Sequence, residues 1–258
     1  HVPDASPDAS DASGRELYRL CLREPTFYVS HLIAMQHVAL IVKRFLKIYP
    51  EMSLSRCFRS MDIVSIERNV MRHARIRIDD KATWYHCYNR IAGTRHDLPF
   101  GDVEREQFVH ILERVSLLYT VQVVAYQAMS NHFHLLVCAP SEKPSAGEVC
   151  HRYELFHNGQ RTLEPDSEEC RAWQSRCRDI SWFMRHLQQL YTTWYNRSQP
   201  VRRRGGLWAD RFKRSLLESG AAVWACWTYI ENNPVRAGMV EHAADYRFCS
   251  HGVWHQTG

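Results

Sequence analysis

The hydrophobic and polar positions of this chain follow two different periods from about residue 83 onward. Short apolar segments of strand length occupy 84–90, 121–128, 133–138 and 212–217. Three longer segments instead carry apolar residues at helical spacing, and they span 102–119, 180–196 and 220–232. The resulting order is strand, helix, strand, strand, helix, strand, helix. That order predicts an α+β fold, namely a ferredoxin-like split β-α-β antiparallel sheet with an extra C-terminal helix.

The remaining parts of the chain have a different composition. Residues 1–13 form an Asp, Ala, Ser and Pro tract that lacks the apolar surface needed for folding, whereas 29–48 has helical spacing. We therefore expect 1–70 to be a helical and partly disordered N-terminal extension, part of it upstream of a natural start at Met71. Residues 71–258 would then form the folded domain.

A second polar segment interrupts that domain between the third strand and the second helix. Residues 139–177 contain three prolines and many carboxylates. Compact domains rarely contain an unstructured loop of this length. We interpret 141–177 as an insertion.

Charge and cysteine content restrict the class of protein. The net charge of +5 and the pI of about 8.7 favour an anionic partner without identifying one. The nine cysteines form no C-x-x-C pair, which is typical of reduced thiols. The most apolar run, 32–42, is too short to span a bilayer, and no secretion signal is visible. We expect a cytoplasmic protein with no membrane partner.

The first candidate for chemistry is the triplet His132-Phe133-His134 at the start of an apolar strand. Because side chains alternate along a strand, both imidazoles point to one face, where they form half of a divalent metal site. Taken alone, the triplet is a weak signal, and a structural pair of surface histidines is the more common explanation of such a pattern.

The second candidate lies on the last predicted helix. Tyr229 and Asn233 are four residues apart and share a helix face, and an amide oxygen suits Mg²⁺ or Mn²⁺. The plainer interpretation is a core tyrosine, followed by a helix-terminal asparagine before Pro234. Two other tyrosines could serve in place of Tyr229. They are Tyr191 and Tyr195, on the preceding helix, whose apolar residues indicate that it mainly packs.

The third candidate is a basic stretch with interleaved aromatic residues, in which Asp210 is the sole acidic residue. Arginine forks suit phosphate oxygens, and aromatic rings stack on unpaired bases, so the stretch favours nucleic acid over a merely solvated loop. The predicted DNA-binding residues are Arg197, Arg202, Arg203, Arg204, Trp208, Arg211, Lys213 and Arg214.

Four segments in order resemble the REP-associated tyrosine transposases, which belong to the small single-tyrosine HUH transposases of insertion sequences. They are MSNHFHLLV (129–137), GLWADRFKRSLLES (206–219), YIENNPVRAGMV (229–240) and DYRFCSHG (245–252).

The resemblance implies that His132 and His134 are the HUH metal ligands, that Tyr229 is the nucleophile and that Asn233 completes the metal shell. The implied function is metal-dependent cleavage and rejoining of single-stranded DNA at hairpin, REP-like palindromic sites through a 5′-phosphotyrosine. The implied protein is a monomer or homodimer. The extension 1–70 and the insertion 141–177 depart from the family pattern.

Two other functions remain open from the sequence. A hydrolytic metalloenzyme with an HxH motif would need further histidine and aspartate ligands, and the residues directly after His134 supply none. A catalytically silent DNA-binding regulator would keep the fold and the basic surface. The intact His132, His134, Tyr229 and Asn233 argue against such a regulator. For His86, on the neighbouring strand, we expect a satisfied core histidine, with a place in the lining of the site as the alternative.

Overall fold

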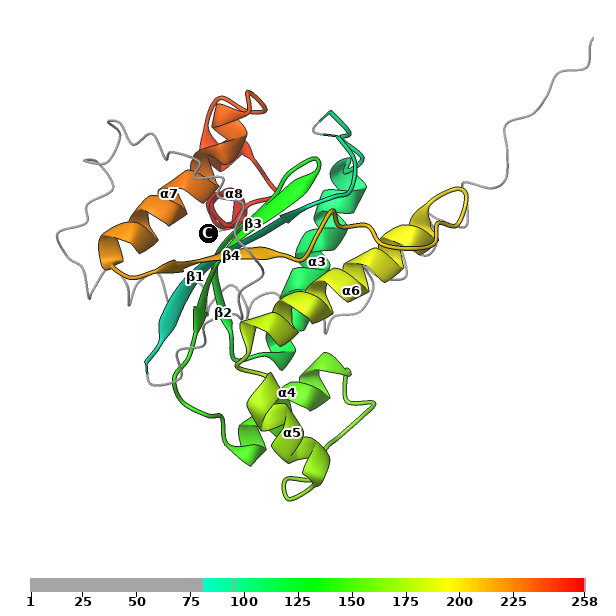
Figure 1. Ribbon diagram of the computed structural model, residues 1–258, viewed down its shortest axis with the longest axis vertical. Coiled ribbons are helices and arrows are strands. Elements are labelled where there is room, and N and C mark those ends of the chain that lie inside the picture. The colour runs from blue at the N-terminus through cyan, green and yellow to red at the C-terminus, as the bar shows by residue number, and fades with distance from the viewer. Residues whose placement is uncertain (1–80, 95, 258) are drawn as a thin grey trace, which may run out of the picture.

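The computed structural model describes residues 81–94 and 96–257. Its centre is a four-stranded antiparallel sheet in the order β2-β3-β1-β4 (Figure 1). The strands are β1 (Thr83–Arg90), β2 (Gln122–Ala128), β3 (His132–Ala139) and β4 (Lys213–Leu217). This strand order is that of the split β-α-β arrangement, so the predicted α+β fold class is confirmed. The expected extension 1–70 lies outside the described residues.

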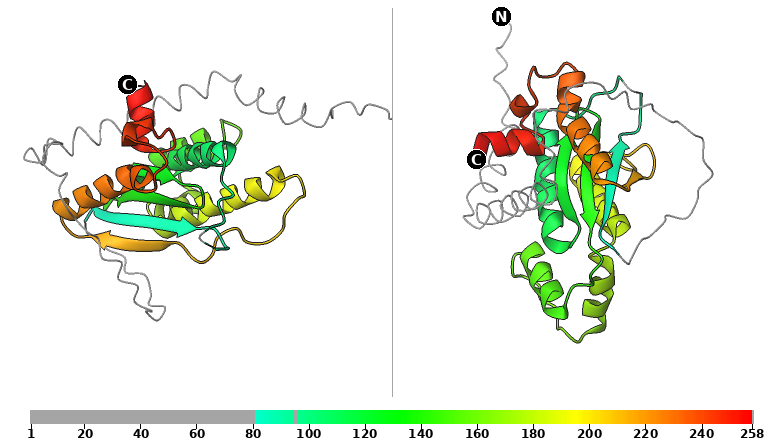
Figure 2. Two further views of the ribbon diagram at one scale, coloured as in Figure 1. Left: turned by 90° about the horizontal axis from the view of Figure 1, so that it is seen from above. Right: turned by 90° about the vertical axis from the view of Figure 1, so that its left-hand side faces the viewer.

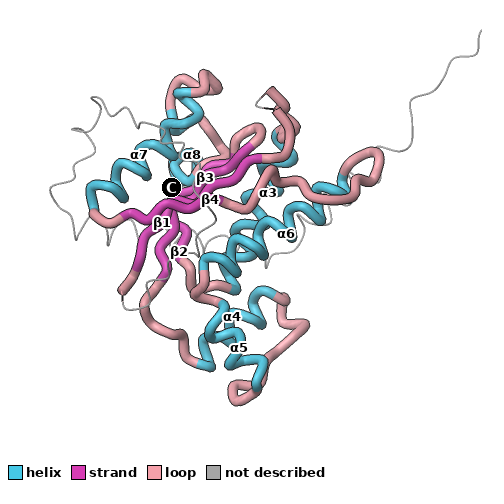
Figure 3. Tube along the Cα trace, in the orientation of Figure 1, coloured by secondary structure: helices cyan, strands magenta, loops and turns pink. Residues whose placement is uncertain are grey.

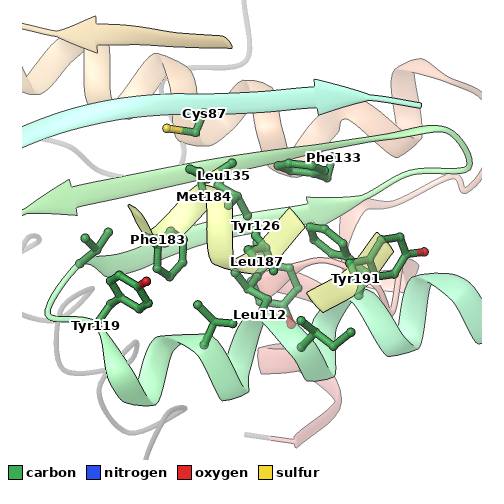
Figure 4. Close-up of a cluster of buried hydrophobic side chains, with 14 of the residues drawn as sticks. Cys87, Leu112, Tyr119, Tyr126, Phe133, Leu135, Phe183, Met184, Leu187 and Tyr191 are labelled. Carbon is green, nitrogen blue, oxygen red and sulfur yellow. The ribbon is translucent and has the colours of Figure 1, made fainter. Parts of the chain in front are cut away.

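Two long helices, α3 (Asp102–Leu118) and α6 (Ile180–Ser198), lie beside the sheet and form the main core with it (Figures 1 and 4). Their apolar stripes face the odd-numbered residues of β3. Phe108, Phe133, Leu135, Phe183 and Leu187 are all fully buried in this layer. Burial of such side chains stabilises the fold by about 1.5–3 kcal/mol each, and this layer therefore fixes the position of β3.

The opposite face of the sheet carries helix α7 (Gly220–Arg236). A smaller apolar cluster joins α7 to this face, with Ile230 packed against Leu136 of β3 and against β2. Because side chains alternate along β3, the face that receives α7 also carries His132 and His134. Figure 3 shows the strands in magenta between α7 on one side and α3 and α6 on the other. The sheet thus has one mainly apolar face and one face that combines apolar packing with the two histidines.

The chain ends in two short elements that cover the β2 edge of the sheet. They are the 3-10 turn η1 (Ala243–Asp245) and helix α8 (Ser250–Thr257), which Figure 2 shows beside the sheet on the side of β2. The backbone N–H of Ala128 donates to the carbonyl of Phe248, at 3.0 Å. Covering an edge strand in this way removes a surface that would otherwise pair with another chain.

The segment interpreted as an insertion contains two helices, α4 (Ala146–Phe156) and α5 (Glu168–Arg176). They lie at the end of the molecule away from α7, with α4 packed against α3 (Figure 1). The guanidinium of Arg152 donates to the carbonyls of Leu117 and Tyr119 and so satisfies the C-terminal end of α3. Helix formation allows this polar segment to satisfy its own backbone groups.

Two details differ from the sequence-based expectation. Helix α7 continues to Arg236 with Pro234 inside it, although we expected it to end at residue 232. Pro234 removes one backbone hydrogen bond but occurs in the last turn, where this loss is small. Helix α8 was not predicted at all. No helix among the described residues is both long and apolar enough to cross a bilayer.

Candidate active site

The two histidines of the triplet lie at the start of β3 on the face that carries α7. Their ring centroids are 5.1 Å apart and their planes are nearly perpendicular, at 86°. Phe133, between them, points into the main core and packs against Phe108. The alternation of the strand therefore brings both imidazoles to one side, as expected from the sequence.

Each imidazole is held by a hydrogen bond to one of its two nitrogens. The Nδ1 of His132 lies 2.7 Å from the side-chain oxygen of Asn131, and the Nδ1 of His134 lies 2.9 Å from the Nε2 of His86. The Asn131 oxygen is an acceptor, so His132 carries its proton on Nδ1 and has a lone pair on Nε2. Such partners fix the tautomer and orientation of metal-binding histidines.

Burial keeps these imidazoles uncharged. It lowers the pKa of His86 and of His132 to about 4. His134 is 6% exposed, and its pKa is well below the usual value because of burial and then because of its two histidine neighbours. All three rings are therefore neutral at pH 7, the state in which a histidine nitrogen binds a metal.

Tyr229 projects from α7 toward these rings. Its ring centroid is 5.5 Å from that of His134 and 6.0 Å from that of His86, edge-on in both cases. The guanidinium carbon of Arg236 lies 5.6 Å from the centroid of the same phenol ring. The structure thus brings together, on one face, the predicted nucleophile, the two predicted metal ligands and the guanidinium of Arg236.

Asn233 lies one helical turn beyond Tyr229. Its side-chain nitrogen is buried and has no hydrogen-bond partner among the described residues. This nitrogen is a hydrogen-bond donor, so water or a phosphate oxygen would satisfy it, and only the side-chain oxygen of the same amide can bind a cation. Two neutral imidazoles and an amide fit a divalent cation such as Mg²⁺ or Mn²⁺. Asn233, His132 and His134 would hold that cation.

The described residues do not contain a cluster of three or more His, Cys, Asp or Glu side chains able to hold a metal ion. The hydrolytic HxH enzymes considered above would need additional ligands of this kind. The described part of the chain therefore gives no support to that alternative.

The rival tyrosines lie on the other face of the sheet. Tyr191 is 0% exposed, and its hydroxyl donates to the backbone carbonyl of Glu104, at 3.0 Å (Figure 4). Burial raises the pKa of the Tyr191 phenol above its usual value. Tyr195 is also buried, against the ring of Phe100. Neither hydroxyl is placed to meet a phosphate held at His132 and His134.

The predicted DNA-binding residues are distributed over both faces of the sheet. Lys213 pairs with Tyr88, which in turn pairs with His134, so Lys213 lies on the histidine face at the β4 edge. Arg214 points the other way, with its guanidinium carbon 5.0 Å from the centroid of the Tyr85 ring. DNA contact by either residue stays a prediction.

The basic loop between α6 and β4 is exposed, and its exposed cationic residues are Arg202, Arg203, Arg204 and Arg211. Arg197, in the last turn of α6, is also exposed. DNA binding by these arginines stays a prediction. Trp208 is different, because it is half-buried between Phe133 and Tyr191 and its indole N–H donates to the carbonyl of Gln188. The structure therefore gives Trp208 a packing role, and base stacking by it stays a prediction.

Sequence reasoning missed two polar residues of this face, Tyr88 and Gln127, and ranked the role of a third, His86, too low. His86, taken as a core histidine, bonds directly to His134. Tyr88 lies beside His134 in the sheet, with ring centroids 5.7 Å apart, and Gln127 pairs with His134 from the other side. Polar residues at every second position of a strand were the available signal, but strand register was needed to interpret it.

Comparison with known proteins gives a distant structural similarity. No protein-family model and no curated protein matches this sequence. Among solved structures, the chain is similar to a REP-associated tyrosine transposase bound to a REP hairpin. The two share 15% identity, the match covers 71% of this chain and 84% of the other, and the TM-score is 0.46. This similarity is distant, so membership in the transposase family stays a prediction from the motifs.

Proposed function

We propose that this protein is a metal-dependent nuclease and transposase of the single-tyrosine HUH type. It would bind, cleave and rejoin single-stranded DNA at hairpin sites. The observation that carries the proposal is the position of the Tyr229 ring against the His134 and His86 rings, on the face shared with His132. A tyrosine and a histidine pair from segments nearly 100 positions apart meet there, as a cleavage site requires.

The chain itself supplies the parts of a phosphoryl-transfer site. A divalent cation at His132, His134 and Asn233 would polarise the phosphate and offset the charge that develops on its oxygens. The Tyr229 hydroxyl oxygen attacks the phosphorus and loses its proton to solvent, while the bond from phosphorus to the 3′ oxygen breaks. Arg236 places positive charge next to the phenol ring, where negative charge develops during attack.

The product would be a 5′-phosphotyrosine and a free 3′-hydroxyl. Because the phosphodiester bond is exchanged and not hydrolysed, a second 3′-hydroxyl can attack the phosphotyrosine and join the strands without ATP. The exposed arginines of the basic loop would hold the phosphate backbone of the substrate. His86 would act through His134, because its hydrogen bond to Nδ1 of His134 leaves Nε2 of that ring as the nitrogen that would hold the cation.

A covalent-adduct assay tests this proposal. The protein is incubated with a hairpin-bearing single-stranded DNA labelled at its 3′ end, and with Mg²⁺, then separated on a denaturing gel; the 3′ label is needed because a 5′-phosphotyrosine retains the fragment downstream of the cut. We expect a labelled adduct with the wild-type protein and with Tyr195→Phe, and none with Tyr229→Phe or in EDTA. Cleavage without an adduct would contradict the tyrosine mechanism, and binding without cleavage would support a catalytically silent regulator.

A further inference from the structure

Gln127 is a buried amide with no partner in the described structure. It lies in β2 and is 0% exposed, and neither its side-chain oxygen nor its side-chain nitrogen makes a hydrogen bond among the described residues. Buried side-chain polar atoms are nearly always hydrogen-bonded, and an amide with both ends unpaired is especially unfavourable. Such a group indicates a ligand that is not part of the chain.

The register of the sheet directs this amide to the candidate metal site. Gln127 pairs with His134, His134 pairs with Tyr88, and Tyr88 pairs with Lys213. Directly paired residues project from the same face with their Cβ atoms about 4.5–5.5 Å apart. Its chain neighbours Tyr126 and Ala128 belong to the main core on the other face. Gln127 therefore lies next to His134, on the face that carries α7.

The surroundings of Gln127 exclude bulk solvent as its partner. Helix α7 packs over β2 and β3 on this face, with Ile230 fully buried one turn before Asn233 and Pro234. Along the outer edge of β2, the backbone of Gln127 bridges to Cys249. The Gln127 amide is thus enclosed beside His134. Asn233, one helical turn beyond Tyr229, also has a buried side-chain nitrogen without a partner in the described structure.

We propose that the Gln127 side-chain oxygen is a further ligand of the divalent cation held at His132, His134 and Asn233. This inference rests on the proposed function. Mg²⁺ and Mn²⁺ favour six ligands with oxygen predominating. Two imidazole nitrogens and two amide oxygens would fill four positions and leave two for water or for oxygens of the scissile phosphate. Gln127 would thereby make the site more selective for a hard cation than the two histidines alone.

The test compares Mn²⁺ binding and metal-free stability in three variants. Gln127→Leu removes the amide, Gln127→Glu keeps two oxygens, and Gln122→Leu is the matched control at an exposed position of the same strand. Mn²⁺ affinity is measured by calorimetry without DNA, and the melting temperature is measured in EDTA.

We expect Gln127→Leu to bind Mn²⁺ about 10- to 100-fold more weakly than wild type. The same variant should melt in EDTA no lower than wild type, because an unpaired buried amide is replaced by an apolar group of similar size. Gln127→Glu should be destabilised in EDTA and should gain more from Mn²⁺ than wild type does. Gln122→Leu should leave Mn²⁺ affinity unchanged.

Three results would overturn the inference, and the first two leave the proposed function standing. If wild type binds Mn²⁺ and Gln127→Leu binds within about twofold of it, Gln127 is not a ligand, although the metal site stands. The same conclusion follows if Gln127→Glu gains no more from Mn²⁺ than wild type, a comparison that applies even if the leucine variant does not fold. If wild type itself binds no Mn²⁺, both the inference and metal dependence fail.

Discussion

Glu231 offers the sharpest test of how helix α7, which carries the proposed nucleophile, is held in place. This carboxylate on α7 is 7% exposed and accepts hydrogen bonds from the indole of Trp227, the hydroxyl of Ser250 and the backbone N–H of His251. The Ser250 hydroxyl also accepts from the backbone N–H of Tyr126 in β2. A single buried side chain therefore ties α7 to α8 and to the edge of the sheet.

The change Glu231→Ala leaves three donors without their acceptor. Each unsatisfied buried donor costs about 1–3 kcal/mol, and entry of water relieves part of this, so we expect a loss of about 4 kcal/mol. For a domain of this size, about 1 kcal/mol corresponds to 2–4 °C, which predicts a melting temperature lower by about 8–16 °C. Glu231→Gln keeps one acceptor oxygen and should cost less.

Thermal unfolding followed by circular dichroism measures this effect, with Glu241→Ala at an exposed position as the control. The control should shift the melting temperature by no more than about 2 °C, since surface substitutions usually change stability by under 0.5 kcal/mol. Equal melting temperatures for Glu231→Ala and Glu241→Ala would refute the role assigned to this carboxylate.

Three further predictions follow from the site and its surroundings. In EDTA, stability should fall as the pH drops from about 6.5 toward 4, because the folded protein keeps His86 and His132 neutral while the unfolded chain takes up protons. At pH 5 this amounts to about 2 kcal/mol for each histidine, so urea unfolding of His86→Gln should show a smaller pH dependence; an identical dependence would contradict this. Tyr191→Phe should lower stability by about 1 kcal/mol yet leave adduct formation intact, and loss of the adduct in a folded variant would make Tyr191 the better nucleophile. Replacing Arg211 and Lys213 by alanine should weaken DNA binding and reduce the slope of log affinity against log salt by up to about 2, whereas an unchanged slope would exclude phosphate contacts.

The sequence was sufficient for the fold because two simple periods separate its strands from its helices. The 133–138 segment is a short, almost continuously apolar run of strand length, and 180–196 repeats its apolar residues at helical spacing. Pro234 was misleading as an end signal, because the helix continues through it to Arg236. The prediction of Tyr229 and Asn233 on one helix face did not depend on that boundary.

The missing part of the site depends on which strands are neighbours. His86 and Gln127 become partners of His134 through the register of β1 and β2 against β3, which no local pattern specifies. Trp208 shows the opposite limit, since an aromatic residue in a basic stretch suggested stacking on bases but packs against Phe133. The type of a residue indicates which interactions it can make, whereas the packing of the folded chain decides whether its side chain faces the core or a ligand.

Mass-spectrometric mapping of the DNA-linked residue tests the central claim most directly. The adduct formed with hairpin-bearing single-stranded DNA and Mg²⁺ is treated with nuclease and protease, and the peptide that carries the remaining nucleotide is sequenced. The account predicts a nucleotide 5′-phosphate on the hydroxyl of Tyr229. A nucleotide on Tyr191, on Tyr195 or on any other side chain would contradict it.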